Sequence, residues 1–278
     1  MPTIETLGFQ VTASASLVAA TMLTGDSNVT RSFKSSNPDG SKNRCIILDA
    51  WTDLQLAGQI NIMSPRMHDN SVGILMNDIK NSTTSLLRES GQWQTLYSQD
   101  ALTLQLAGSG VAGDFNFGFM TLFYDNLGGI NSMLINQPIL RKYGTANLTN
   151  VSISMGSVAG SAGTWQTATA INAATATQAL KDNTYYAVKG ITSTVQAGAV
   201  SFRGVNTGNV RLAVPANPSL NHITSSYFVR LSNLYGLSCI PVFNTANAGN
   251  TLVEVVQDEN AATTVVNLHL VELSQNPF

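Results

Sequence analysis

Charged residues are scarce in this sequence. Only 11% of the 278 residues are Asp, Glu, Lys or Arg, and the net charge is −2, whereas about 25% of a typical soluble domain is charged. The apolar share of 44% argues against an intrinsically disordered chain, which would be poor in apolar residues. Charged residues are depleted where protein interfaces are buried. The composition therefore indicates a folded protein whose surface is largely covered by other subunits.

Basic residues are missing from the start of the chain. No Lys or Arg precedes Arg31, so the sequence has no basic arm. Neutralisation of phosphates by Lys and Arg supplies most of the nonspecific affinity of proteins for nucleic acid. We therefore expect no direct binding to nucleic acid.

Long hydrophobic runs and cysteines are also few. The first ten residues, MPTIETLGFQ, have neither the charged start nor the apolar core of a signal peptide. No stretch approaches the ~20 apolar residues that a membrane-spanning helix needs. Cys45 and Cys239 are too few for a disulfide framework, and we expect them to be buried thiols. The sequence predicts a protein that is neither secreted nor membrane-spanning.

Strand patterns dominate what is present. Phe115, Phe117 and Phe119 alternate with Asn116 and Gly118, which predicts a strand with one face in a core. The same reasoning places Leu268 in a core. Short runs of this type predict strands near 9–20, 45–53, 59–64, 72–77, 101–107, 115–124, 150–158, 164–171, 185–194, 199–204, 209–214, 225–232, 237–244, 251–257 and 263–273. Helix is expected near 81–90 and after Pro215, and the Ala/Thr-rich run 167–180 fits either helix or edge strand.

The sequence contains an internal repeat. Residues 45–63, CIILDAWTDLQLAGQINIM, align without a gap with residues 185–203, YYAVKGITSTVQAGAVSFR, 140 positions later. Both stretches carry an Ala-Gly pair at the same place. Further matches in the same order pair 11–19 with 151–159, 72–76 with 210–214, and 115–127 with 265–275. A repeat this long indicates two copies of one domain rather than a solenoid of short units.

The fold class expected is all-β, with about eight antiparallel strands in each copy and little helix. A sandwich, a barrel and a jelly roll all fit this pattern, and eight strands in two packed sheets favour the jelly roll. We therefore predict two tandem eight-stranded jelly-roll barrels, at residues 1–127 and 145–278, joined by a connector at 128–144.

A charge-poor chain of two tandem jelly-roll-like repeats resembles the double jelly-roll major capsid proteins of icosahedral, often membrane-containing bacteriophages and their adenovirus relatives. The paired stretches 45–63 and 185–203 carry this resemblance. It implies a structural protein, not an enzyme, that forms homotrimers with six similar barrels and tiles a virion shell. The implied partners are further copies of the chain, a vertex or penton protein, and an internal membrane. The implied location is the virion, after synthesis in the host cytoplasm.

Residue types that could carry chemistry do not form a recognisable motif. His68, His222 and His269 lack the close spacing of metal ligands, and Asn37, Asp39 and Asn43 lack the Glu that closes a calcium loop. Asp49 and Asp53 lie four apart, roughly 13 Å on a strand, and are expected to be solvated. We therefore predict no catalytic, cofactor-binding or metal-binding residues.

Two other function classes stay open. The chain could be a different virion or surface β-protein, such as a tail, spike or adhesin. It could also be a carbohydrate-binding protein with two jelly rolls, in which Trp51, Trp93 and Trp165 form a platform for sugars. Packing in a core or at a subunit interface is the competing interpretation of these tryptophans.

Overall fold

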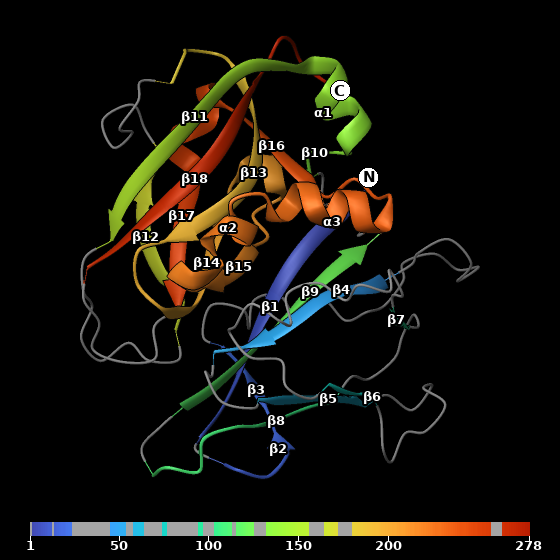
Figure 1. The fold of residues 1–278 in the computed structure, drawn as a ribbon, viewed down its shortest axis with the longest axis vertical. Coiled ribbons are helices and arrows are strands. Elements are labelled where there is room, and N and C mark those ends of the chain that lie inside the picture. The colour runs from blue at the N-terminus through green and yellow to red at the C-terminus, as the bar shows by residue number, and fades with distance from the viewer. Residues whose placement is uncertain are drawn as a thin grey trace.

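The protein is built mainly of antiparallel β-sheets (Figure 1). The computed structural model of the 278-residue chain describes residues 2–12, 14–23, 45–53, 58–63, 74–76, 94–96, 103–112, 115–124, 132–155, 164–171, 180–256 and 263–278. Four sheets form in these ranges, and none of the four closes into a barrel there. The all-β expectation is confirmed at this level.

Two sheets belong to the N-terminal half of the chain. Sheet N1 has the spatial order β3 (Thr21–Met22), β1 (Thr3–Thr12), β9 (Phe115–Tyr124), β4 (Cys45–Thr52) and β7 (Gln94–Leu96). Sheet N2 has the order β2 (Val18–Ala19), β8 (Thr103–Ala107), β5 (Gln59–Met63) and β6 (Ile74–Met76). The strand expected at 9–20 is therefore wrong in its bounds, because β1 begins at Thr3 and ends at Thr12.

The other two sheets belong to the C-terminal half. Sheet C1 has the order β10 (Leu134–Ile135), β16 (Ile240–Asn244), β13 (Tyr185–Ser193), β18 (Thr264–Leu273) and β11 (Gly144–Met155). Sheet C2 has the order β12 (Gln166–Ala170), β17 (Leu252–Val256), β14 (Ala197–Arg203) and β15 (Leu212–Ala216). None of the four sheets pairs a strand of one half with a strand of the other in the described ranges.

Short helices join the strands of the C-terminal half. They are α1 (Gln137–Tyr143), α2 (Asn221–Thr224) and α3 (Tyr227–Tyr235), with single 3₁₀ turns at η2 (Val205–Thr207), η3 (Pro218–Leu220) and η4 (Thr245–Asn250). Helix after Pro215 is confirmed. The counterpart expected near 81–90 lies outside the described residues.

One predicted strand, at 225–232, is wrong because the chain forms helix α3 there. The buried side chains of α3 are Tyr227, Phe228, Leu231, Ser232 and Tyr235, a spacing that fits one face of a helix and not the two-residue period of a strand. The helix ends before Gly236, whose positive φ of 68° suits a residue without a Cβ.

The segment expected to be a plain connector, 128–144, is partly structured. Within it, β10 pairs with β16 and so extends sheet C1. Helix α1 follows directly, and the side chain of Asn136 caps it by accepting a hydrogen bond from the N–H of Ile139 at 3.1 Å. The described part of this segment, from residue 132 onward, therefore joins the C-terminal half.

The two halves repeat one strand order. If strands β3 and β10 are set aside, the remaining strands of each half can be numbered one to eight along the chain. In this numbering N1 and C1 both have the order 1-8-3-6, and N2 and C2 both have the order 2-7-4-5. The 140-residue offset matches β4 with β13 and β5 with β14. The repeat detected in the sequence thus corresponds to equivalent strands.

Each half has an apolar core between its own two sheets. In the N-terminal half this core includes Leu7, Ile60, Leu106 and Leu122. In the C-terminal half Leu268 is fully buried in the main cluster, as expected. Phe117 is also fully buried, but it packs with residues of both halves rather than in the N-terminal core. The placement predicted for Phe117 is therefore wrong.

Truncating Leu268 to Ala tests the core of the C-terminal half. We expect the free energy of unfolding to fall by about 2–5 kcal/mol, because the removed atoms leave a cavity among fully buried neighbours. Urea denaturation measures this loss. Val265→Ala is the matched control on the same strand, since Val265 is only partly buried. Equal losses for the two variants would contradict this assignment of faces.

Candidate functional site

The histidines do not converge on a metal site. The exposed His222 places Nδ1 3.1 Å from the carbonyl oxygen of Ser219. The half-buried His269 places Nε2 2.9 Å from the hydroxyl of Thr192. His68 lies outside the described residues. Across the ranges that the structure describes, no three His, Cys, Asp or Glu side chains are grouped so that they could hold a metal ion.

Cys239 is a buried free thiol whose pKa is raised by burial. A raised pKa keeps it protonated and unreactive, in line with the structural role expected for it. Cys45 begins β4, and its side chain is not among the parts described. The possible calcium loop of Asn37, Asp39 and Asn43 also lies outside the described residues.

The expectation of solvated carboxylates at Asp49 and Asp53 is wrong. Asp49 is 4% exposed and Asp53 is 5% exposed. Asp49 accepts hydrogen bonds from the hydroxyl of Tyr227 at 2.7 Å and from the N–H of Ala50 at 2.9 Å. Asp53 accepts one from the N–H of Phe117 at 3.0 Å. The C-terminal half covers Asp49 through Tyr227, and Asp53 is held within sheet N1 by the backbone of Phe117.

An aromatic cluster forms where the two halves meet. From the N-terminal half it contains Trp51 and Phe119, whose rings stack with centroids 5.4 Å apart. From the C-terminal half it contains Trp165, whose ring lies edge-on to Phe119 at 6.0 Å. Because Trp51 and Trp165 are buried here, neither presents a face to a sugar. Trp93 lies outside the described residues.

Close backbone contacts bring the two halves together around this cluster. The N–H of Thr6 donates to the carbonyl of Arg211 at 2.7 Å, and the Thr6 hydroxyl accepts from the N–H of Ala213 at 3.0 Å. A Cβ at Gly198 would lie 3.1 Å from the ring of Phe119. Gly198, the glycine of the Ala-Gly pair in the C-terminal half, therefore lets the ring of Phe119 pack closely against it.

Helix α3 adds two tyrosine anchors to the contact. Tyr227 donates to Asp49, and Tyr235 donates to the carbonyl of Leu48 at 2.5 Å. The pKa of Tyr227 is raised well above its usual value, chiefly by burial and then by the charge of Asp49. Tyr227 therefore stays protonated and keeps donating. Figure 1 shows α3 beside the ends of β1, β9 and β4.

A buried ion cluster lies on the C2 side of the contact. Glu254 is fully buried, and its Oε2 lies 2.6 Å from Nε of Arg211 and 3.0 Å from Nε of Arg203. The guanidinium of Arg211 also lies over the ring of Trp165, with 5.1 Å between Cζ and the centroid. The cluster thus links a charge pair to the aromatic packing between the halves.

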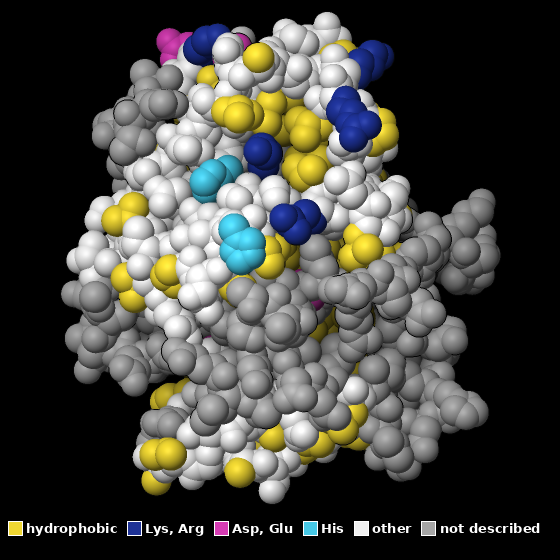
Figure 2. Space-filling model, viewed as in Figure 1, with side chains coloured by type: hydrophobic (Ala, Val, Ile, Leu, Met, Phe, Trp, Pro, Cys, Tyr) yellow, Lys and Arg dark blue, Asp and Glu magenta, His cyan; other side chains and the backbone are white. Residues whose placement is uncertain are grey.

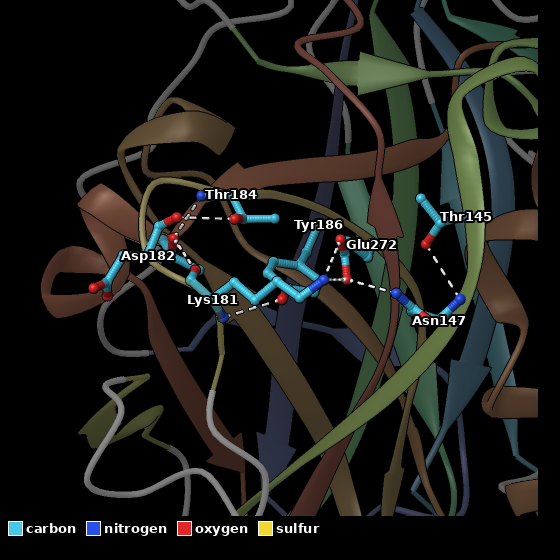
Figure 3. A network of polar contacts seen from close by, with 8 residues as sticks. Thr145, Asn147, Lys181, Asp182, Thr184, Tyr186 and Glu272 are labelled. Carbon is cyan, nitrogen blue, oxygen red and sulfur yellow. Dashed lines mark hydrogen bonds and ion pairs between the residues drawn. The ribbon is translucent and has the colours of Figure 1, made fainter.

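A second polar network lies on the surface of the C-terminal half (Figure 3). Lys181 and Glu272 form an ion pair at 2.7 Å, and Asn147 donates to Glu272 at 3.1 Å. The N–H of Lys181 donates to the hydroxyl of Tyr186 at 3.2 Å. The hydrogen bond between Lys181 and Glu272 raises the pKa of Lys181 and lowers the pKa of Glu272. This network fastens the segment before β13 to strands β11 and β18.

This arrangement packs the two halves of the chain against each other through apolar, polar and charged groups. The sequence signal for the contact was available in β9, FNFGFMTLFY. Its odd positions carry Phe117 and Phe119, and its even positions carry Met120 and Leu122. A strand that is apolar on both faces is covered on both faces. The alternation of residues 115–119 predicts only the Phe face, so the second apolar face with Met120 and Leu122 was missed.

Comparisons with known proteins give no family. No family model matches the chain, and no curated protein matches it. Among solved structures, the chain is similar to the crystal structure of PBSX exported protein XepA, at 10% identity and a TM-score of 0.23. The match covers 98% of this chain and 86% of that one. A TM-score this low carries no argument about fold or function. None of the described helices is long and apolar enough to cross a membrane.

Replacing Glu254 with Ala tests the ion cluster. We expect the free energy of unfolding to fall by about 3–5 kcal/mol, because Arg211 and Arg203 lose the carboxylate beside them in a buried site. Guanidinium or urea denaturation gives the value. The control is Glu272→Ala, which removes a surface carboxylate from the network of Figure 3 and is expected to cost much less. Similar losses of free energy of unfolding in both variants would mean that the buried cluster stabilises the protein no more than the surface ion pair does.

The stability of the protein is expected to depend on pH through His269. Its pKa is lowered from 6.5, first by burial and then by the charge of Lys189. As pH falls below about 6.5, the unfolded chain binds a proton that the folded chain does not, so the free energy of unfolding falls until the folded pKa is reached. His269→Gln removes this contribution. Urea denaturation at pH 7.5 and 5.5 measures it, and an identical pH dependence in the variant would contradict it.

Proposed function

We propose that residues 1–127 and 145–278 form two jelly rolls and that the protein is a major capsid protein. The observation that carries this proposal is the strand pairing. A jelly roll is a long antiparallel hairpin rolled into two sheets, so strand 1 pairs with 8, 2 with 7, 3 with 6 and 4 with 5. All four pairs occur in each half. Eight strands in two Greek keys are typical of viral capsid domains.

The contact between the halves supports assembly into a ring. The outer face of N1 packs against the outer face of C2, so two different surfaces of the repeated fold meet. Contacts between unlike surfaces generate closed rings when the rotation per step closes. Three chains would supply six similar lobes. We propose a homotrimer of this kind, which tiles an icosahedral shell in the virion.

The scarcity of charge supports the same conclusion. With 11% charged residues and a net charge of −2, many copies can pack with little mutual repulsion. The further partners proposed are a vertex protein and an internal membrane, with no direct contact to nucleic acid. The protein acts as a structural subunit and not as an enzyme. The burial of Trp51 and Trp165 removes two of the three residues on which the carbohydrate-binding alternative depended.

Sedimentation of the full chain tests the proposed trimer. We expect a particle of three times the 29.5 kDa chain mass at micromolar concentration. Because few ion pairs would lie at its interfaces, the trimer is expected to persist at ~1 M salt, where the screening length is about 3 Å. A species that remains monomeric under all these conditions would contradict the capsid proposal.

A further inference from the structure

The two halves contact each other through faces that are not equivalent. Sheet N1 presents the face that carries Thr6, Trp51 and Phe119, and sheet C2 presents the face that carries Gly198 and Ala213. Since both halves repeat one strand order, C1 has a face equivalent to that of N1. Likewise N2 has a face equivalent to that of C2. Within one chain these two faces do not meet each other.

The C1 face is open to solvent along β11, and the outward residues Val265, Asn267 and His269 of β18 are half-buried. Asn150 and Ser154 on β11 are exposed, and they point away from the core residues Val151, Ile153 and Met155. Helices α2 and α3 cover the neighbouring strand β13 instead, where a Cβ at Gly190 would collide with the backbone of Thr224. Figure 2 looks onto this side of the molecule and shows mostly uncharged side chains, with several Lys and Arg and few acidic ones.

The N2 face also has exposed side chains. On β8, Thr103 is exposed and Gln105 is half-buried. The alternate residues Leu104 and Leu106 lie in the core. Leu75 on β6 is 43% exposed. Strands β2, β8, β5 and β6 contain no Asp, Glu, Lys or Arg. This face therefore offers hydroxyl, amide and apolar groups.

In chemical character, the C1 and N2 faces match each other better than they match the N1 and C2 faces of the internal contact. Strand β11, GTANLTNVSISM, also has no charged residue, whereas the internal C2 face contains Glu254 with its two arginines. At the position of Glu254 in the repeat, β8 has Gln105, which accepts a hydrogen bond from Asn61 at 3.2 Å. Where N1 has Phe117 and Phe119, β18 has polar side chains, including Asn267.

We propose that a second copy of this chain docks the outer face of its sheet N2 on the β11–β18 face of sheet C1. The inference rests on the proposed shell function and names the surfaces through which its subunits meet. The contact repeats the internal one in geometry but replaces aromatic rings and ions with amides and hydroxyls. Such a contact is wetter and more easily reversed than the internal one, which suits subunits that must assemble after folding.

The ionic cluster also explains why the pairing stays in order. Among the described strands, C2 carries Glu254 with Arg203 and Arg211, and N1 carries the aromatic side chains of the contact between the halves. An exchange of partners would place an uncharged N2 face over aromatic residues and leave the ion cluster against β11 and β18. Discrimination between similar surfaces commonly depends on such mismatches.

Two arginine substitutions in the full chain test the proposal. Ser154→Arg alters the C1 face and Thr103→Arg alters the N2 face, and each is expected to yield a monomer because an unpaired charge would be buried. A mixture of the two variants in equal amounts is expected to form a dimer. Each variant keeps one intact face, so one contact can form and the ring cannot close. Sedimentation gives the masses, and thermal melting verifies folding.

Val111→Arg is the matched control, since Val111 is 63% exposed in a loop outside both faces, and its trimer is expected to persist. If Ser154→Arg fails to fold, Asn150→Arg tests the same face. A parent trimer that survives both face variants, or a mixture that stays monomeric, would overturn the assignment of faces while leaving the trimer itself intact. A monomeric parent protein would instead refute the proposed function.

Discussion

The structure depends on the burial of sheet N1 on both of its faces. One face forms the core of the N-terminal half with sheet N2, and the other packs against the C-terminal half through Trp51, Phe117 and Phe119. Apolar side chains on both faces of β9 would leave a large aromatic surface in water if the halves separated. The hydrophobic effect therefore holds the two halves together as well as stabilising each core.

Polar groups fix how the halves meet. A hydrophobic contact is not directional, but the bonds of Thr6 to Arg211 and of Tyr227 to Asp49 allow only one register. The Glu254 cluster lies entirely in the C-terminal half, and it includes Arg211, whose carbonyl accepts the bond from Thr6. Buried ion pairs are weak sources of stability relative to apolar packing. Their contribution here is to hold Arg211 beside Trp165 at the contact between the halves.

The duplication gives one fold two different uses. Equivalent strands recur in equivalent order, yet the outward-facing positions differ: N1 has Phe117 and Phe119 where C1 has Asn267 and His269, and C2 has an ion cluster where N2 has amides. The first pair of faces meets within a chain, where the local concentration is high and separation is not needed. The second pair is free to meet another copy. The buried cluster of Glu254 with Arg203 and Arg211 lies at the contact that never has to open.

The sequence by itself determined most of the longer strands and their repetition, because strand periodicity and the 140-residue offset are local or directly comparable signals. It also indicated that Cys239 is buried. It missed the short strands β7 and β10 and misplaced the bounds of β1. It gave the wrong structure for 225–232, whose helical stripe was mistaken for strand alternation, and the wrong surroundings for Asp49, Asp53 and Phe117. Only the tertiary structure decided which face of each strand meets the other half. A two-residue period separates the faces of a strand but does not say what covers them, since that depends on contacts between residues more than a hundred positions apart.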